Sequence, residues 1–213
     1  QPRGGGKEEV LLDGNAMAAG HTFFALAGSS HSPDQTRIGY AVDYEGSERY
    51  TIHIRDLATG KDLPDEIAST DGTVAWAPDG QSFYYVWVNE NVRAQKVLRH
   101  KLGTPSSADE LLYEEKDPGF LVSVGFTSSG RFLEVGTGDN QTNELWLLDT
   151  QAADPKLELF WKREPGVRTS VTHSGEKLYI LTSAGDAPDF RVLEADVVDA
   201  DPKHWREIVP HVE

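Results

Sequence analysis

Four copies of one pattern run along this chain of 213 residues. Each copy has a polar turn, an aromatic-rich apolar run, a second run that ends in a charged tight turn, and an acidic outer run. The polar turns are residues 31–34, 77–80, 127–130 and 172–175. Their equivalent residues Asp34, Asp79, Ser129 and Ser174 are 45, 50 and 45 positions apart. A period of about 45 to 50 residues is typical of four-stranded blades, so the repeat predicts a β-propeller.

The apolar runs have the length and composition of β-strands. They are about 5 to 7 residues long, rich in Tyr, Phe, Val and Ile, and joined by Gly- and Asn-containing turns that permit tight hairpins. We predict second strands at residues 37–42, 82–88, 131–135 and 177–182, and third strands at 50–56, 95–101, 144–149 and 190–196. Outer strands are predicted at residues 63–67, 111–115, 157–162 and 206–209.

Small residues dominate the run in front of each polar turn, at residues 24–28, 74–77, 122–125 and 169–172. The innermost strands of a propeller converge on a central channel, where bulky side chains would collide. We therefore assign these four runs to the innermost strands. Chance could explain one such run but hardly four.

The predicted fold class is all-β, a β-propeller segment of about four four-stranded antiparallel blades. The blades are expected at residues 16–67, 68–117, 118–164 and 165–213. Residues 8–13 are predicted to form a leading outer strand. No stretch has the periodicity of a long amphipathic helix, so we expect almost no helical structure.

The net charge of −15, from 35 acidic and 20 basic residues, limits the classes of partner. Nucleic acids are bound through clustered Lys and Arg, and the chain has no such cluster, so nucleic acid is excluded as an expected partner. An acidic field could attract cationic peptides and accelerate their encounter. The acidic surface could equally serve solubility alone.

Targeting and redox signals are sparse. No run of 18 apolar residues is present, so we expect no membrane span, and no signal peptide is recognisable at the N-terminus. The absence of cysteine excludes disulfides, thiolate metal sites and cysteine catalysis. This composition fits a reducing compartment, and we expect a cytoplasmic location.

Motifs that carry chemistry are missing from the sequence. It lacks the metalloprotease helix motif, a Gly-rich phosphate loop, an EF-hand loop and the Gly-x-Ser-x-Gly elbow. We therefore assign no catalytic, cofactor-binding or metal-binding residues, and we expect no cofactor. The seven histidines, at positions 21, 31, 53, 100, 173, 204 and 211, include no pair four residues apart.

Two histidines occupy comparable places in the repeat. His31 and His173 lie at the opening turns of the first and fourth copies, which could indicate a shared function. A structural role in capping the turn is the favoured interpretation. His53 and His100 fall in third strands and are predicted to lie on the strand surface.

The five tryptophans, at positions 76, 87, 146, 161 and 205, could form a stacking platform. Because each falls on a strand of the repeat, packing within or between blades is the favoured interpretation. Residues 140–142 match a glycosylation sequon, which matters only in a secretory setting. No Trp-Asp dipeptide occurs, so the repeat does not indicate a WD40 scaffold.

Several phrases of the repeat are more specific than its period. They are residues 9–15 (EVLLDGN), 50–60 (YTIHIRDLATG), 74–80 (VAWAPDG), 100–104 (HKLGT) and 113–117 (YEEKD). In these phrases the chain resembles the propeller domain of the oligopeptidase B (protease II) group, in the prolyl oligopeptidase family of serine peptidases. The resemblance covers essentially the whole chain. It is strongest from Glu8 to about Val124 and weaker after Thr150.

The resemblance implies a two-domain enzyme. In that family an α/β-hydrolase domain with a Ser, Asp and His triad is covered by a seven-bladed propeller that admits short peptides, and oligopeptidase B members cut after Lys and Arg. The triad belongs to the hydrolase domain, so no position here matches it. The implied partners are short, basic peptides and a C-terminal hydrolase domain. With four blades of seven, and Gln1 rather than Met at its start, the chain is expected to be a segment of a longer protein.

Three functional hypotheses follow. The favoured one is a non-catalytic lid that restricts access to a serine oligopeptidase by size. The alternatives are a free-standing propeller that binds a protein or peptide, and a propeller enzyme with its own site at the channel mouth. A four-blade arc exposes blade faces and strand edges, so we expect self-association or contraction into a distorted closed form.

Overall fold

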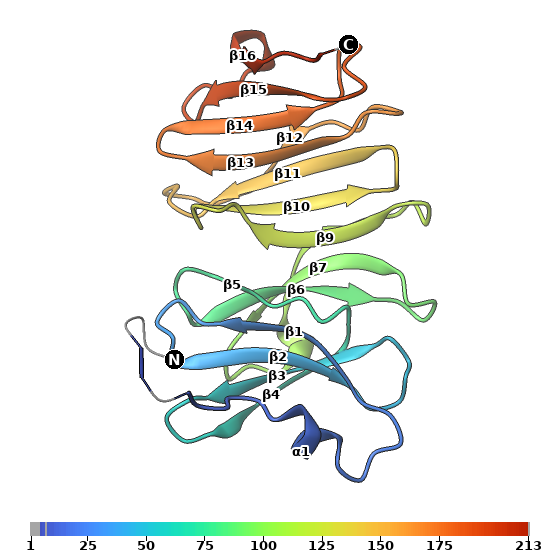
Figure 1. Ribbon diagram of the computed structural model, residues 1–213, viewed down its shortest axis with the longest axis vertical. Coiled ribbons are helices and arrows are strands. Elements are labelled where there is room, and N and C mark those ends of the chain that lie inside the picture. Colours follow the sequence, from blue (N-terminus) through green and yellow to red (C-terminus); the bar gives the residue numbers. More distant parts are fainter. Residues whose placement is uncertain (1–4, 7, 213) are drawn as a thin grey trace. The chain divides into compact units, whose positions relative to one another are not determined.

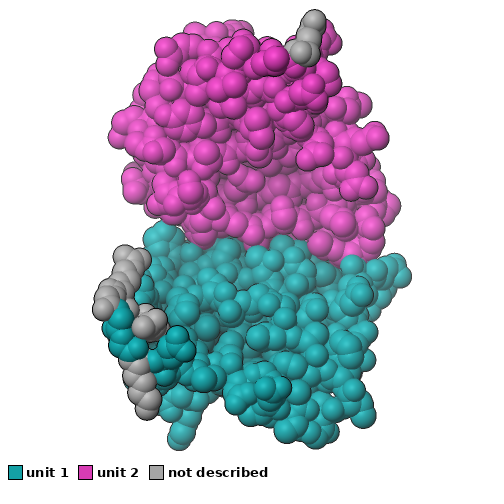
Figure 2. Space-filling view, in the orientation of Figure 1, with its two compact units in different colours: residues 1–92, 99–110 teal, residues 93–98, 111–213 magenta. Residues whose placement is uncertain are grey.

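The computed structural model describes residues 5–6 and 8–212, which form sixteen β-strands, one short α-helix and two 3-10 helices of three residues each. The chain divides into two compact units, each described by itself below (Figure 2). Unit 1 comprises residues 1–92 and 99–110, and unit 2 comprises residues 93–98 and 111–213. The sheets are antiparallel, two of them with four strands, and the predicted all-β fold is therefore confirmed (Figure 1).

The first copy of the repeat forms the antiparallel strands β1 (Ala25–His31), β2 (Arg37–Asp43), β3 (Tyr50–Asp56) and β4 (Lys61–Thr70), each paired with the next. The second copy contributes β5 (Ala75–Trp76), β6 (Ser82–Val88), β7 (Ala94–Lys101) and β8 (Glu110–Glu114). Within unit 1, β5 pairs with β6, and Thr70 at the end of β4 pairs with Trp87 of β6.

Unit 2 holds two complete four-stranded sheets. The third copy forms β9 (Leu121–Phe126), β10 (Phe132–Gly138), β11 (Asn143–Asp149) and β12 (Leu157–Trp161). The fourth copy forms β13 (Thr169–Ser174), β14 (Lys177–Thr182), β15 (Arg191–Asp196) and β16 (Arg206–Val209). In both sheets the strands lie in chain order, which is the meander expected from the repeat.

The predicted strands occur in the predicted order, but some ends differ. Strand β5 has two residues where four were predicted, since Pro78 follows almost at once and cannot donate to the ladder. Strand β4 is longer than predicted and contains Pro64, which an outer strand tolerates because one of its sides needs no partner. Strand β10 continues to Gly138, three residues beyond the apolar run.

Residues 8–13 form no strand, so the predicted leading outer strand is wrong in this structure. A strand needs a neighbour for its N–H and C=O groups, and here the carbonyl of Leu11 accepts from Nη1 of Arg55 at 3.2 Å. Asp13 instead caps the helix α1 (Gly14–Ala18), because its Oδ1 accepts from the N–H groups of Asn15 and Ala16.

The opening turns of the first three copies share one hydrogen-bond pattern. Asp34, Asp79 and Ser129 each accept from the N–H group two residues ahead, which is the Asx or Ser turn expected from these residue types. The fourth copy differs because Ser174 pairs with Lys177 across a tighter turn. Gly175 occupies that turn with φ of 62°, a conformation that favours glycine.

Small residues in the innermost strand of the first copy are explained by close backbone approach. Strand β1 is irregular between Leu26 and Ser29. At Gly28 an added Cβ would lie 2.9 Å from the carbonyl oxygen of Gly72. Because the obstructing atom belongs to the backbone, a side chain here would force the strands apart.

The core of unit 2 lies between its two sheets. Apolar side chains from the sheet β9–β12 meet those of the sheet β13–β16, and the buried members are Phe132, Leu145, Leu147, Val171, Leu178, Ile180 and Ala195. Trp161 and Trp205 stack on each other at the rim of this cluster, with ring centroids 5.9 Å apart. Face-to-face packing of consecutive sheets therefore holds the unit together.

Candidate functional site

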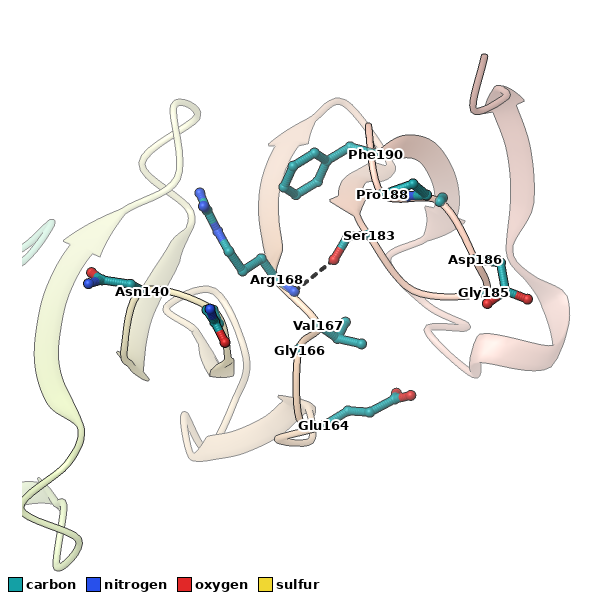
Figure 3. Close-up of a pocket in the computed structure, with 12 residues that line it drawn as sticks. Asn140, Glu164, Gly166, Val167, Arg168, Ser183, Gly185, Asp186, Pro188 and Phe190 are labelled. Carbon is teal, nitrogen blue, oxygen red and sulfur yellow. Dashed lines mark hydrogen bonds between the residues drawn. The ribbon is translucent and has the colours of Figure 1, made fainter. Parts of the chain in front are cut away.

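A pocket of about 850 Å³ opens among three loops of unit 2 (Figure 3). We call it the loop pocket, and its lining comes from residues 140–141, 164–168 and 183–190. These loops join β10 to β11, β12 to β13, and β14 to β15. A volume of this size is within the range of small-ligand sites.

Side-chain hydrogen bonds fix the first two loops. Oδ1 of Asp139 accepts from the N–H groups of Gln141 and Thr142, each at 2.7 Å, and these bonds lower the pKa of Asp139. Thr142 Oγ1 accepts from the N–H of Gly166 at 2.9 Å. The side-chain amide of Asn143 makes two hydrogen bonds with the backbone of Thr169. Its Oδ1 accepts from the N–H group, and its Nδ2 donates to the carbonyl oxygen.

The third loop carries unusual backbone conformations. Gly185, Asp186 and Phe190 have φ values of 68°, 58° and 66°. A positive φ costs an aromatic residue such as Phe free energy, and such strain persists only where the surroundings hold it. Ser183 anchors the loop, because its Oγ accepts from the N–H of Arg168 at 3.0 Å. The loop between β14 and β15 is thus tied to the connection between β12 and β13 and holds a defined conformation.

Charges of both signs line the loop pocket. Figure 3 shows Arg168 on one side, with the Phe190 ring beside it, and Glu164 and Asp186 on the other. The guanidinium carbon of Arg168 lies 5.6 Å from the centre of the Phe190 ring, a cation–π distance. Among the described residues, none of these three charged groups has an ion-pair partner. The site can therefore offer both a cation and carboxylates to a ligand.

Of the residues that line the loop pocket, the sequence alone singled out only Asn140 and Gln141, as part of a glycosylation sequon and not as a binding site. One signal was present, because the loop at 183–190 is longer than the corresponding hairpin loops at 44–49, 89–93 and 139–142. Long loops on a rigid scaffold are where binding residues concentrate. The charges of Glu164, Arg168 and Asp186 fall in three connections that only the fold brings together.

His100 is at the centre of a buried charged cluster in unit 1, so its predicted place on the strand surface is wrong. Its side chain is 1% exposed. Nδ1 lies 2.7 Å from Oδ1 of Asp109, and Nε2 lies 3.0 Å from Oδ1 of Asp65. Both ring nitrogens of His100 therefore lie within hydrogen-bond distance of a buried carboxylate. Tyr85 Oη and the N–H of Gly103 donate to the same carboxylates.

The other histidines have simpler surroundings. His173 is buried, and its Nδ1 lies 2.7 Å from Oγ of Ser129 in the opening turn of the preceding copy. This contact supports the structural interpretation of His173, although the bond is to a side chain and not to the turn backbone. His31 is exposed. His53 is half-buried and stacks against Tyr40, with centroids 5.5 Å apart.

Tryptophans serve packing, as predicted, where the structure shows their contacts. Trp76 is buried, and its Nε1 donates to the carbonyl of Ser30 at 2.9 Å. Trp161 and Trp205 border the core of unit 2. Trp146 Nε1 donates to Glu144 at 2.9 Å. These contacts leave no exposed aromatic platform among the four.

Another buried carboxylate, Glu115, joins the end of the second copy to the third within unit 2. It accepts from Thr137 Oγ1 at 2.6 Å, from the N–H of Asp117 at 2.9 Å and from Nη2 of Arg163. Burial alone would raise the pKa of Glu115, but these donors outweigh it and lower the pKa. No sequence pattern marks Glu115 as a buried carboxylate, because its side-chain partners Thr137 and Arg163 are distant along the chain.

Glu134 is the contrasting case, a carboxyl group without such donors. It lies on β10 between Gly125 of β9 and Leu147 of β11. Among the described residues none donates a hydrogen bond to its side chain. Burial therefore raises the pKa of Glu134 to about 7.

The part of the chain that the structure describes contains no group of three or more His, Asp or Glu that could hold a metal ion. None of the helices in that part is both long enough and apolar enough to cross a bilayer.

The family model described as the prolyl oligopeptidase N-terminal beta-propeller domain matches residues 1–213. Among curated proteins, protease 2 of Moraxella lacunata is 33% identical over 198 residues, which are 92% of this chain and 29% of that protein. Dipeptidyl aminopeptidase BI of Pseudoxanthomonas mexicana is 32% identical over 206 residues, which are 96% of this chain and 28% of that protein.

Solved structures of oligopeptidase B have a fold similar to that of this chain. Oligopeptidase B from Leishmania major superposes with a TM-score of 0.89 at 32% identity, over 96% of this chain and 29% of that one. Oligopeptidase B from Trypanosoma brucei, in a closed form with covalently bound antipain, gives a TM-score of 0.87 at 32% identity. The superposition covers 100% of this chain and 30% of that one. The chain thus spans less than a third of the length of the relatives it matches.

We predict that His100→Ala destabilises the protein by about 3 to 5 kcal/mol, because it leaves the buried carboxylates of Asp65 and Asp109 without the imidazole ring that both contact. Urea unfolding followed by tryptophan fluorescence measures the effect. The matched control is His31→Ala at an exposed position, which should change stability by less than about 0.5 kcal/mol. Equal stability of the two variants would contradict the proposed role of the buried cluster.

A second prediction concerns pH. The pKa of Glu134 is about 7 in the folded protein against an ordinary value of 4.5, so the folded state binds the extra proton between these values. Its contribution to stability is full below pH 4.5 and is lost as pH rises through 7, by about 3 kcal/mol in total.

The Glu134→Gln variant isolates this effect, since glutamine does not titrate. Unfolding free energies of the two proteins should be similar near pH 4.5, and the variant should be the more stable by pH 8. Parallel stability profiles from pH 4.5 to pH 8 would show that Glu134 does not titrate abnormally.

Proposed function

The chain belongs to the prolyl oligopeptidase N-terminal β-propeller family, and on that premise we propose that it is the non-catalytic lid portion of a serine oligopeptidase. The observation that carries the proposal is the match over residues 1–213 to the propeller domain of much longer peptidases. In this proposal the nucleophile, its base and the oxyanion site belong to a hydrolase domain, and this chain restricts access to them.

The proposed mechanism is steric. Stacked antiparallel sheets whose hairpins are fixed by side-chain hydrogen bonds form a rigid wall. Such a wall passes a flexible peptide and excludes a folded protein, whose diameter cannot shrink without unfolding. Selection by size then requires no contact with particular side chains of the substrate. The closed form of the Trypanosoma brucei relative, with its covalently bound antipain, supports an enclosed site in a related enzyme.

Charge supplies the second part of the proposal. A net charge of −15 generates a negative field that raises the local concentration of cationic peptides. We therefore propose substrates with Lys or Arg at the cleaved position, as the resemblance to oligopeptidase B implies. A field of this kind is screened by salt, with a Debye length of about 8 Å at physiological ionic strength.

The last sheet of unit 2, β13–β16, offers a surface for a partner. One face of this sheet carries two exposed apolar side chains, Leu181 at 43% and Val209 at 51% exposure. Both lie opposite Val192 on a neighbouring strand. An apolar face of this kind is normally covered. We propose that another part of the peptidase covers it in the whole protein, and that isolated chains associate through it. A cytoplasmic location stays a prediction.

Comparing the whole peptidase with a form that lacks residues 1–213 tests the lid function. We predict that the whole enzyme cleaves a short Arg-containing peptide and spares a folded protein with an exposed Arg loop. The shortened form should cleave both, because the steric barrier is gone. The same peptide with Gln in place of Arg controls for the requirement of a basic residue. An unchanged ratio of the two cleavage rates would refute the lid.

Sedimentation of the isolated chain tests the exposed face. The wild-type chain should sediment as a dimer or larger species, and Leu181→Glu should sediment as a monomer, since a buried charge is costly in an apolar contact. Val198→Glu is the matched control, because Val198 is 90% exposed and lies outside the face. A wild-type chain that stays monomeric at all concentrations would exclude this mode of association.

A further inference from the structure

The loop pocket offers opposite charges at its two sides, and this arrangement selects among ligands. Arg168 stands on one side, and Glu164 and Asp186 on the other (Figure 3). A lone anion would meet two carboxylates, and a lone cation would meet a guanidinium. A ligand that carries both a cation and an anion can contact both sides at once.

Arg168 is distinguished from most arginines of unit 2 by its lack of a carboxylate partner. Arg131, Arg163, Arg191 and Arg206 each pair with an Asp or Glu within the unit. In the described part of this acidic chain, no ion pair reaches Arg168, which is exposed and rests on the ring of Phe190. A guanidinium held by an aromatic ring keeps its planar donors free for a carboxylate.

The floor and walls of the loop pocket suit a peptide chain. Val167 and Ala187 are buried beneath it, and Pro188 and Phe190 add apolar surface. The side-chain amides of Asn140 and Gln141 are exposed at its edge and can hydrogen-bond to peptide groups. About 850 Å³ accommodates a few residues and is far too small for a folded partner.

Preorganisation favours binding at these loops. The bonds from Arg168 to Ser183 and from Gly166 to Thr142 hold the two strand connections in place before a ligand arrives. The left-handed conformations of Asp186 and Phe190 set the positions of the carboxylate and the ring. A site that is already ordered loses less conformational entropy on binding.

We propose that the loop pocket binds the C-terminus of a short peptide that ends in Lys or Arg. The terminal carboxylate contacts Arg168, and the terminal basic side chain contacts Glu164 and Asp186. A peptide cleaved after Lys or Arg carries this pair of charges on one residue. The inference rests on the proposed preference for basic peptides, and it makes the loop pocket a site for the product of that cleavage. No covalent step is involved.

Fluorescence anisotropy with the 213-residue chain tests the assignment at low salt. The probe is rhodamine-labelled Ala-Ala-Ala-Arg as the free acid, compared with its C-terminal amide and with a citrulline analogue that has lost the side-chain charge. We expect the amide and the citrulline peptide each to bind about tenfold more weakly than the free acid, because each lacks one charge-assisted contact.

Variants assign each contact to its residue. Arg168→Ala should abolish the difference between acid and amide, and Arg168→Lys should restore part of it. The Glu164→Gln, Asp186→Asn double variant should abolish the difference between arginine and citrulline. Lys203→Ala, an exposed cation outside the loop pocket, is the control and should bind all three probes as wild type does. Circular dichroism verifies that each variant is folded.

Several outcomes would overturn the proposal. These are no binding of the free acid below about 1 mM, equal binding of acid and amide, or equal binding of arginine and citrulline peptides. Loss of the differences in Lys203→Ala would also overturn it, since the effect would then be one of net charge. None of these results bears on size exclusion, which is measured by cleavage of folded substrates, so failure of this inference is separable from failure of the lid function.

Discussion

Apolar packing between consecutive four-stranded sheets is the interaction on which the rest of unit 2 depends. Phe132 and Leu147 of one sheet meet Leu178 and Ile180 of the next, and each buried side chain of this kind contributes about 1.5 to 3 kcal/mol. The same packing brings three loops, from different hairpins and connections, to the edge of one pocket. It also buries Glu134 and leaves the far face of the last sheet uncovered.

Local features of the fold were predictable from the sequence, and contacts between distant segments were not. Alternating apolar residues and turn residues located the strands, because strand formation and hairpin turns depend on neighbours in the chain. Residues 8–13 have a strand-like composition but no neighbouring strand, so they serve instead to hold Arg55 and to begin α1. His100 looked like a surface residue because its partners Asp65 and Asp109 come from other segments.

The candidate site was the least predictable part. Glu164, Arg168 and Asp186 are ordinary loop charges in the sequence, and no motif marks them. Sheet packing sets them around one cavity, and within the described part of the chain none of them has an ion-pair partner; neither property can be read from the sequence. The family resemblance, by contrast, was visible in the phrases at residues 50–60 and 74–80, since each is a continuous stretch of sequence that can be compared without knowledge of the fold.

The central claim is that this propeller segment selects substrates by size while the chemistry occurs elsewhere in the protein. The most direct test is kcat/KM of the whole peptidase for Arg-containing substrates of increasing folded diameter, from an unstructured peptide to a folded protein with an exposed Arg loop, with and without residues 1–213. The whole enzyme should show a steep fall with substrate diameter, and the shortened form a flat profile. The same fall in both would contradict this claim, because size selection would then reside in the hydrolase domain alone.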